Sequence, residues 1–196
     1  ADDAHVGALF KVENVGKMIF EDSYVEGIGS FEPDGPVNGY PPLIDISYGK
    51  HLSGSTDTVY KQLQNLSFRG NVVKEYLMVI SDNRVNVTSN LDKLLLKNLQ
   101  FHMNIASDQG MMRANNIPEL FLLEIKANHN CGQLVHAASD SAATSRMIMI
   151  DSQINDQRVG TSASGLFSGV FSEVIVANSL FTQNRVDNCQ LDKGDA

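Results

Sequence analysis

The sequence predicts an all-β fold, a parallel β-helix built from repeating coils, and three observations lead to this prediction. Short apolar runs recur along the 196 residues. An Asp, Asn or Glu residue follows each run at the same place. Four of these residues, Asn98, Glu124, Asp151 and Asn178, are 26, 27 and 27 residues apart. A fixed period in this range is typical of solenoid proteins.

The apolar runs have the length and composition of β-strands. They are short, rich in Val, Ile, Leu and Phe, and end at Asn, Asp, Gly or Ser, as strands do. Amphipathic helices would need apolar residues at helical spacing over ten or more positions. The runs, with a weaker copy named last, are Met18–Phe20, Leu94–Leu96, Leu120–Leu122, Met147–Met149, Val174–Val176 and Lys61–Leu63.

The acidic or amide residue after each run is expected at the corner between two strands. A corner often needs a left-handed backbone, which Asn and Asp tolerate best among residues other than glycine. Their side chains also hydrogen-bond to the backbone of the turn. The expected corners are Asp22, Asn65, Asn98, Glu124, Asp151 and Asn178.

Two further runs complete each repeat, so that a coil contains about three short strands. Upstream, a glycine precedes an apolar stretch in Gly7–Phe10, Gly110–Met112, Gly132–Val135 and Gly165–Phe167. Downstream, a poorer run follows in Asn104–Ile105, Gln157–Val159 and Asn184–Val186. Coils stacked in register would pair their backbones about 4.8 Å apart.

Alternate residues after each corner are expected to point into the solenoid. The inward set is Ser23, Leu99, Ile125, Ser152 and Ser179, followed two positions later by Val25, Phe101, Ala127, Ile154 and Phe181. The outward set is Tyr24, Gln100, Lys126, Gln153 and Leu180.

The chain is expected to form one domain over residues 1–196, with about six to seven coils and a protruding loop at 28–60. The segment Phe31–Pro42 holds four of the five prolines with Asp-Gly and Asn-Gly pairs, which are turn signals. Leu43–Tyr48 is a candidate strand within that loop. A smaller insertion is expected at Val72–Thr88, in which Leu77–Ile80 is the strand of its own coil. The start without Met favours a piece of a longer protein with contiguous domains.

Composition excludes several classes of partner. The net charge is -8 and no basic run occurs, which argues against nucleic acid and anionic lipid, because both are bound by clustered Lys and Arg. The N-terminus lacks the basic and apolar regions of a signal peptide. No apolar stretch is long enough to span a bilayer, so membrane insertion is not expected.

The order of residues in Gly165–Val186, "GLF…VIVANSLFTQNRV", resembles the GLUG motif. Gly7–Gly27 and Gly132–Val159 are similar to it as well. This repeat occurs in bacterial surface and secreted proteins, including adhesins and large secreted proteases. The resemblance implies a right-handed β-helix on a secreted or cell-surface bacterial protein. It carries no catalytic residues onto this chain.

Paired carboxylates are one candidate for catalysis. Glu124 and Asp151 occupy the same corner in successive coils and would lie about 5 Å apart if stacked. Carboxyl groups at that separation serve retaining glycosidases. The alternative is that these residues, like Asn98 and Asn178, satisfy the geometry of the turn.

The segment Ala127–His136 brings together a second group of reactive side chains. Cys131 with His136 would form a nucleophilic dyad, and His129, Cys131 and His136 would supply three ligands to a metal. The structural alternative is that Cys131 and Cys189, the two cysteines, are small buried thiols, although an even pair is also able to form a disulfide. No cofactor is expected.

The leading functional prediction is a non-catalytic binding or scaffold module of a secreted bacterial protein, such as an adhesin, a passenger domain or a translocated effector. It would contact a host or surface protein or a glycan through a flat sheet face and protruding loops. The alternative is a carbohydrate-active β-helix enzyme, a polysaccharide lyase or glycoside hydrolase, with the paired carboxylates. A third alternative is an enzyme that depends on Cys131.

Overall fold

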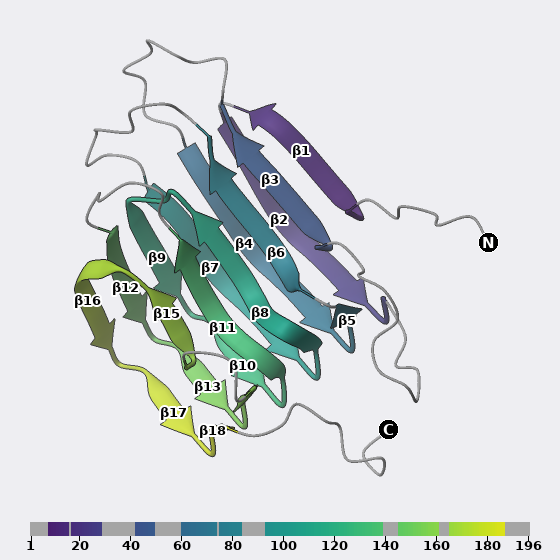
Figure 1. Ribbon diagram of the computed structural model, residues 1–196, viewed down its shortest axis with the longest axis vertical. Helices are drawn as coiled ribbons and strands as arrows, with labels where there is room; N and C mark the ends of the chain where they lie inside the picture. Colours follow the sequence, from purple (N-terminus) through teal and green to yellow (C-terminus); the bar gives the residue numbers. More distant parts are fainter. Residues whose placement is uncertain are drawn as a thin grey trace.

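The computed structural model is all-β, and no helix occurs among the residues it describes, which are 8–15, 17–28, 42–49, 60–73, 75–83, 93–138, 145–160 and 165–186. The strands form two parallel sheets (Figure 1). The first sheet contains β1 (Phe10–Val15), β3 (Ile44–Tyr48), β5 (Val72–Val73), β6 (Tyr76–Asp82), β8 (Ile105–Asn115), β11 (Cys131–Ala138), β14 (Arg158–Val159), β15 (Phe167–Gly169) and β18 (Arg185–Val186). The second contains β2 (Lys17–Glu26), β4 (Tyr60–Arg69), β7 (Lys93–His102), β9 (Glu119–Leu123), β10 (Lys126–Asn128), β12 (Ser145–Ile150), β13 (Gln153–Asn155), β16 (Phe171–Ala177) and β17 (Leu180–Thr182).

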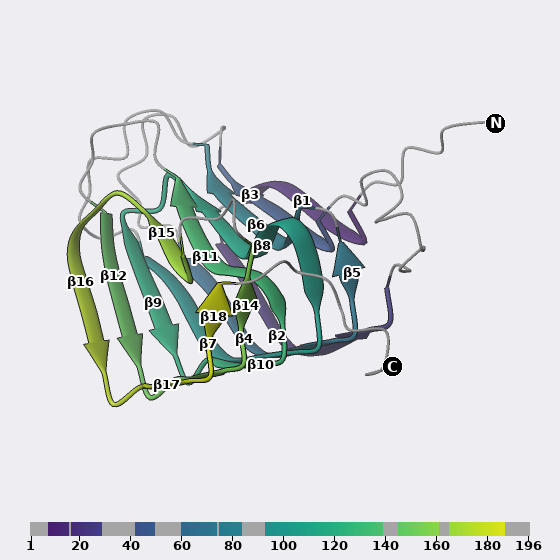
Figure 2. The ribbon, with the colours of Figure 1, turned by 60° about the horizontal axis from the view of Figure 1, so that its bottom comes forward.

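The chain winds from one sheet to the other and back, so that successive coils lie side by side (Figure 2). The predicted repeat is present residue by residue in the strand register. Leu94 pairs with Leu120, Leu120 with Met147, and Met147 with Val174. The weak copy belongs to the same ladder, because Lys61 pairs with both Met18 and Leu94.

All six predicted corners have a left-handed backbone. Their φ angles lie between 49° and 57° at Asp22, Asn65, Asn98, Glu124, Asp151 and Asn178. A second left-handed position, which the sequence analysis missed, follows each corner five residues later. Its φ angles lie between 45° and 66° at Gly27, Gly70, Met103, His129, Asp156 and Gln183. Each coil therefore bends twice by the same local device.

The core lies between the two sheets and is built from stacked rows of like side chains. The expected inward residues Leu99, Phe101 and Ile154 are fully buried, whereas the outward Gln100 and Gln153 are exposed. The rings of Phe68 and Phe101 stack in adjacent coils with centroids 5.3 Å apart. Each such side chain contributes about 1.5–3 kcal/mol through the apolar surface that it removes from water.

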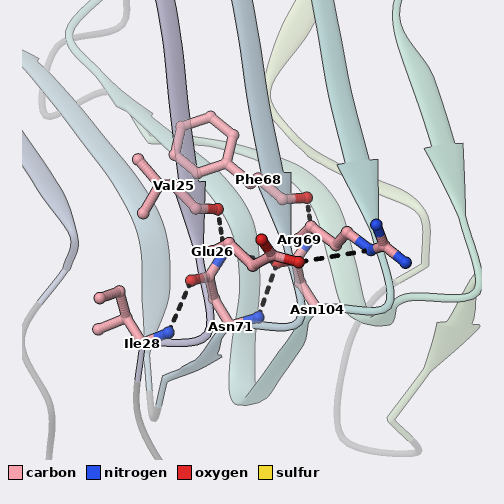
Figure 3. A network of polar contacts seen from close by, with 7 residues as sticks. All are labelled: Val25, Glu26, Ile28, Phe68, Arg69, Asn71 and Asn104. Carbon is pink, nitrogen blue, oxygen red and sulfur yellow. Dashed lines mark hydrogen bonds and ion pairs between the residues drawn. The ribbon is translucent and has the colours of Figure 1, made fainter.

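A ladder of buried amides lines the second bend of the coils. Each member lies six residues after a corner: Asn71, Asn104, Asn130 and Gln157 are buried, and Asn184, in the last described coil, is half-buried. Figure 3 shows its beginning: the Asn71 side chain accepts from the Ile28 amide at 3.0 Å and donates to the Val25 carbonyl at 3.0 Å. Its Nδ2 also donates to Oδ1 of Asn104 at 2.9 Å. The ladder therefore satisfies backbone groups that the bend takes out of the sheets.

The prediction of a single protruding loop at 28–60 is wrong for Leu43–Tyr48. Residues Ile44–Tyr48 form β3, which pairs with β1 and β6 and buries Ile44, Ile46 and Tyr48. The turn signals on either side led to the wrong expectation, because they mark loops but do not tell whether the strand between them is part of a coil. Residues 29–41 and 50–59 lie outside the described part. The expected strand Leu77–Ile80 is confirmed within β6.

Candidate functional site

A row of side chains crosses the outer face of the first sheet, one from each coil. In register, Arg113 of β8 lies between Val79 of β6 and His136 of β11, and His136 pairs with Ser168 of β15. The row continues through Asp45 and Lys11 on β3 and β1. Neighbours along the strands, such as Met112 and Val135, are buried in the core. Because side chains alternate along a strand, the row faces outward.

Polar contacts link this row to a second one, two residues further along the strands. Nε of Arg113 donates to Oδ1 of Asn115 at 2.8 Å, and Nδ2 of Asn115 donates to Oγ of Ser81 at 2.9 Å. Nδ1 of His136 and Oγ of Ser168 form a hydrogen bond of 2.7 Å. These side chains are half-buried, so they are held in place while their outer atoms face solvent.

Tyr76, the first residue of β6, packs against two side chains of the row. Its ring lies 6.2 Å from the ring of His136 and 5.7 Å from Cζ of Arg113, and its hydroxyl donates to Oε1 of Gln109 at 2.9 Å. We call the group the Arg113 cluster, which consists of Tyr76, Ser81, Arg113, Asn115, His136 and Ser168.

Burial and charge set the protonation of the cluster. Burial lowers the pKa of His136, and the nearby Arg113 guanidinium lowers it further. Burial raises the pKa of Tyr76. At neutral pH the cluster therefore presents one guanidinium, one neutral imidazole, hydroxyl groups and an amide. These groups donate and accept hydrogen bonds in a flat array, which suits a ligand rich in hydroxyl groups.

Glu124 and Asp151 lie at successive corners of the second sheet, as the sequence predicts. The strands on both sides of the corner are in register, since Leu123 pairs with Ile150 and Lys126 with Gln153. Oε1 of Glu124 lies 3.7 Å from Nζ of Lys97. A left-handed backbone favours Asn and Asp, which occupy five of the six predicted corners. A catalytic role for the pair stays a prediction.

Cys131 is buried and disulfide-bonded, which corrects the expectation of two free thiols. The only other cysteine, Cys189, lies outside the described residues. A sulfur held in a disulfide is not the thiolate that nucleophilic catalysis needs. The dyad of Cys131 with His136 is therefore not formed, and His136 instead bonds to Ser168.

The three ligands proposed for a metal are not gathered at one point. His129 is on the outer edge, with Nε2 3.5 Å from Oδ2 of Asp156, whereas Cys131 is in a disulfide and His136 is in the Arg113 cluster. Within the described ranges, no group of three or more His, Cys, Asp or Glu side chains is arranged to hold a metal ion.

Sequence reasoning singled out His136 but missed the rest of the cluster. The signal was present in the glycine-containing strands, where one residue directly follows each apolar pair. That residue is Lys11 after Leu9-Phe10, Arg113 after Met111-Met112, His136 after Leu134-Val135 and Ser168 after Leu166-Phe167. Aligning the strands by their apolar pairs would have brought these four residues into one row.

No family model, curated protein or solved structure matches this chain. In the part of the chain that the structure describes, no helix is long and apolar enough to cross a membrane.

Proposed function

We propose that this chain is a non-catalytic binding and scaffold module of a secreted bacterial protein and that it binds a glycan through the Arg113 cluster. The single observation that carries the proposal is the outward row that places Arg113, His136 and Ser168 on adjacent strands. Adjacent parallel strands lie about 4.8 Å apart, so the row presents its polar side chains at regular intervals across the sheet. Half-buried, preorganised side chains lose little conformational freedom when a ligand binds.

We also propose that the chain is a single right-handed parallel β-helix with about three strands per coil. The resemblance of Gly165–Val186 to the GLUG repeat supports this handedness. A general rule supports it too, because crossovers between parallel strands of one sheet are right-handed in nearly all proteins. A crystal structure tests it directly, and a left-handed winding would overturn it.

Secretion is supported by the disulfide at Cys131, because disulfides persist in oxidising compartments and are rare in the cytosol. A host or surface protein is the other partner that a flat sheet face would suit.

The binding proposal is tested on an array of neutral and acidic oligosaccharides. We expect the wild-type chain to bind at least one class of glycan and Arg113→Ala to lose that binding. The matched control is Lys97→Ala, which removes an exposed cation from the second sheet and should bind as the wild type does. Unchanged binding by Arg113→Ala, or a wild-type chain that binds no glycan, would contradict the proposal.

The alternative function is a carbohydrate-active enzyme, favoured by the register that stacks Glu124 and Asp151. Incubation with polysaccharides distinguishes the two functions. A binding module releases no new reducing or unsaturated ends. Cleavage that is lost in Glu124→Gln, with an unchanged melting temperature, would support the enzyme instead.

A further inference from the structure

A lysine and an aspartate meet in the solvent-free interior between the two sheets. Nζ of Lys61, on β4, lies 2.9 Å from Oδ2 of Asp82, the last residue of β6, and both side chains are fully buried. Lys61 occupies an inward position of β4 and pairs in register with Met18 of β2 on one side and Leu94 of β7 on the other. The ion pair therefore replaces apolar contacts in the core of the second and third coils.

Tyr48 is the neighbour of this pair. It pairs in register with Asp82, and its ring centroid lies 5.3 Å from Nζ of Lys61. Burial raises the pKa of the Tyr48 hydroxyl, and the charge of Asp82 adds to this effect, so the phenol keeps its proton. Among the described residues, the buried hydroxyl has no hydrogen-bond partner. An orphaned buried donor beside a carboxyl group calls for an explanation.

Two buried charges carry a large desolvation cost, even when they are paired. In a medium of low dielectric constant, transfer of one proton from Nζ to Oδ2 gives an uncharged amine and an uncharged carboxylic acid in contact. These are the two reactants of amide formation. In water the ionised forms are strongly solvated and resist condensation, whereas here that solvation is absent.

We propose that Lys61 and Asp82 condense into an intramolecular isopeptide bond. The lone pair of the neutral Lys61 amine attacks Cγ of the Asp82 carboxyl group, and a C–N bond forms. The C–O bond to the carboxyl hydroxyl then breaks. One proton of the amine leaves with that hydroxyl as water, and no oxidant or reductant takes part. The Tyr48 hydroxyl, which keeps its proton, would serve as a donor to the oxygen that becomes negative during the attack if its side chain turned toward Asp82.

The fold supplies what this reaction needs. Strands on two sheets hold the amine and the carboxyl group in contact, which gives a high effective concentration. The amide product is uncharged, so the desolvation cost of the ion pair disappears. The product is a covalent tie across the interior that joins β4 of the second sheet to β6 of the first.

The mass of the wild-type chain tests the proposal without any variant. After reduction of disulfides, we expect the intact chain to be lighter than its sequence by one water. Trypsin should fail to cleave after Lys61, and a branched peptide should join residues 51–69 to residues 75–84. An intact mass equal to that of the sequence, with cleavage after Lys61, would overturn the proposal.

Two variants locate the bond. Lys61→Arg keeps a cation in the core but removes the amine nucleophile, so its chain should have its full sequence mass. Asp82→Asn should still condense, now releasing ammonia, and should yield the same branched peptide as the wild type. A loss of water that persists in Lys61→Arg would place the modification elsewhere and would also overturn the proposal.

Discussion

Asn104 illustrates how single residues determine this fold. Its side chain is fully buried, and Nδ2 donates to the Phe68 carbonyl at 2.8 Å and to Oδ1 of Asn130 at 3.0 Å. Its Oδ1 accepts from the backbone amide of Asn71 at 3.1 Å and from the Asn71 side chain at 2.9 Å. One side chain thus satisfies groups in three successive coils, and no apolar residue of similar size is able to do so.

Replacing Asn104 with Ala should therefore be costly. The change removes the Asn104 partner of the Phe68 carbonyl, of the Asn71 backbone amide and of one proton on Nδ2 of Asn71, and each such group costs about 1–3 kcal/mol. We expect the free energy of unfolding to fall by roughly 3–5 kcal/mol, measured by urea denaturation. Asn155→Ala, in a half-buried ladder on the outer edge, is the matched control and should cost about 1 kcal/mol. An equal loss of unfolding free energy in both variants would show that the buried amide ladder stabilises the fold no more than the half-buried one.

At the scale of the strand, the contact between β8 and β11 depends on Gly110. A Cβ atom at this position would collide with the backbone carbonyl of Gln133 on the adjacent strand. Gly110→Ala should push the strands apart and lower the free energy of unfolding by about 1–3 kcal/mol, the usual cost of overpacking. The control is Gly160→Ala, where a Cβ would meet no atom of the described residues within 4 Å. It should be neutral within about 0.5 kcal/mol by the same denaturation measurement. A Gly110→Ala chain as stable as the wild type would contradict this strand spacing.

The packing of β11 against β8 and β15 also makes stability depend on pH. Burial and Arg113 lower the pKa of His136 in the folded chain relative to its usual value of 6.5. Between the lowered folded value and 6.5, the unfolded chain binds more protons, so stability rises with pH. Stability should consequently be lost as the pH falls from 6.5 through the folded pKa, and the urea midpoint should decrease.

His136→Gln removes this titration while retaining a side chain able to bond to Ser168. The urea midpoint of the variant should decrease less between pH 7.5 and pH 5 than that of the wild type, although His102, whose pKa burial also lowers, titrates in both. Circular dichroism at each pH checks that the strands are retained. Parallel pH profiles for the two chains would contradict the role of His136.

The sequence predicted most of the strands because their determinants are local. Apolar runs and left-handed corners repeat once in each coil. The spacing of Asn98, Asp151 and Asn178 therefore predicted the register in which neighbouring strands pair. The contact of Lys61 with Asp82 was not predictable in this way, because it depends on how a strand of one sheet faces a strand of the other. The Arg113 cluster was hidden for a related reason: Arg113, His136 and Ser168 share a row but not a residue type, and the other members come from outside that row.

At the scale of the whole molecule, the described strands of each coil pair with strands of the adjacent coils. If the coils stack as a solenoid, as we propose, stability is approximately a sum of terms for the coils and for the interfaces between them. The central rows of β7 bury Leu96, Leu99 and Phe101 between coils on both sides. In the last described coil, the equivalent inward residues Val176 and Phe181 are 46% and 39% exposed. Protection from solvent therefore falls from the middle of the stack toward this end.

Hydrogen exchange should reproduce this gradient, because amides open with free energies that depend on local burial. Peptides that contain β7 and β8 should exchange roughly tenfold or more slowly than peptides that contain β16 and β17, as measured by mass spectrometry. Asn104→Ala, which weakens the middle of the stack, should speed exchange in β7 and β8 more than in β16, where opening is already easy. Uniform protection across all coils, or exchange in β16 as slow as in β7, would contradict a stack held only by neighbouring coils. It would instead indicate that the last coil is covered in solution by another surface.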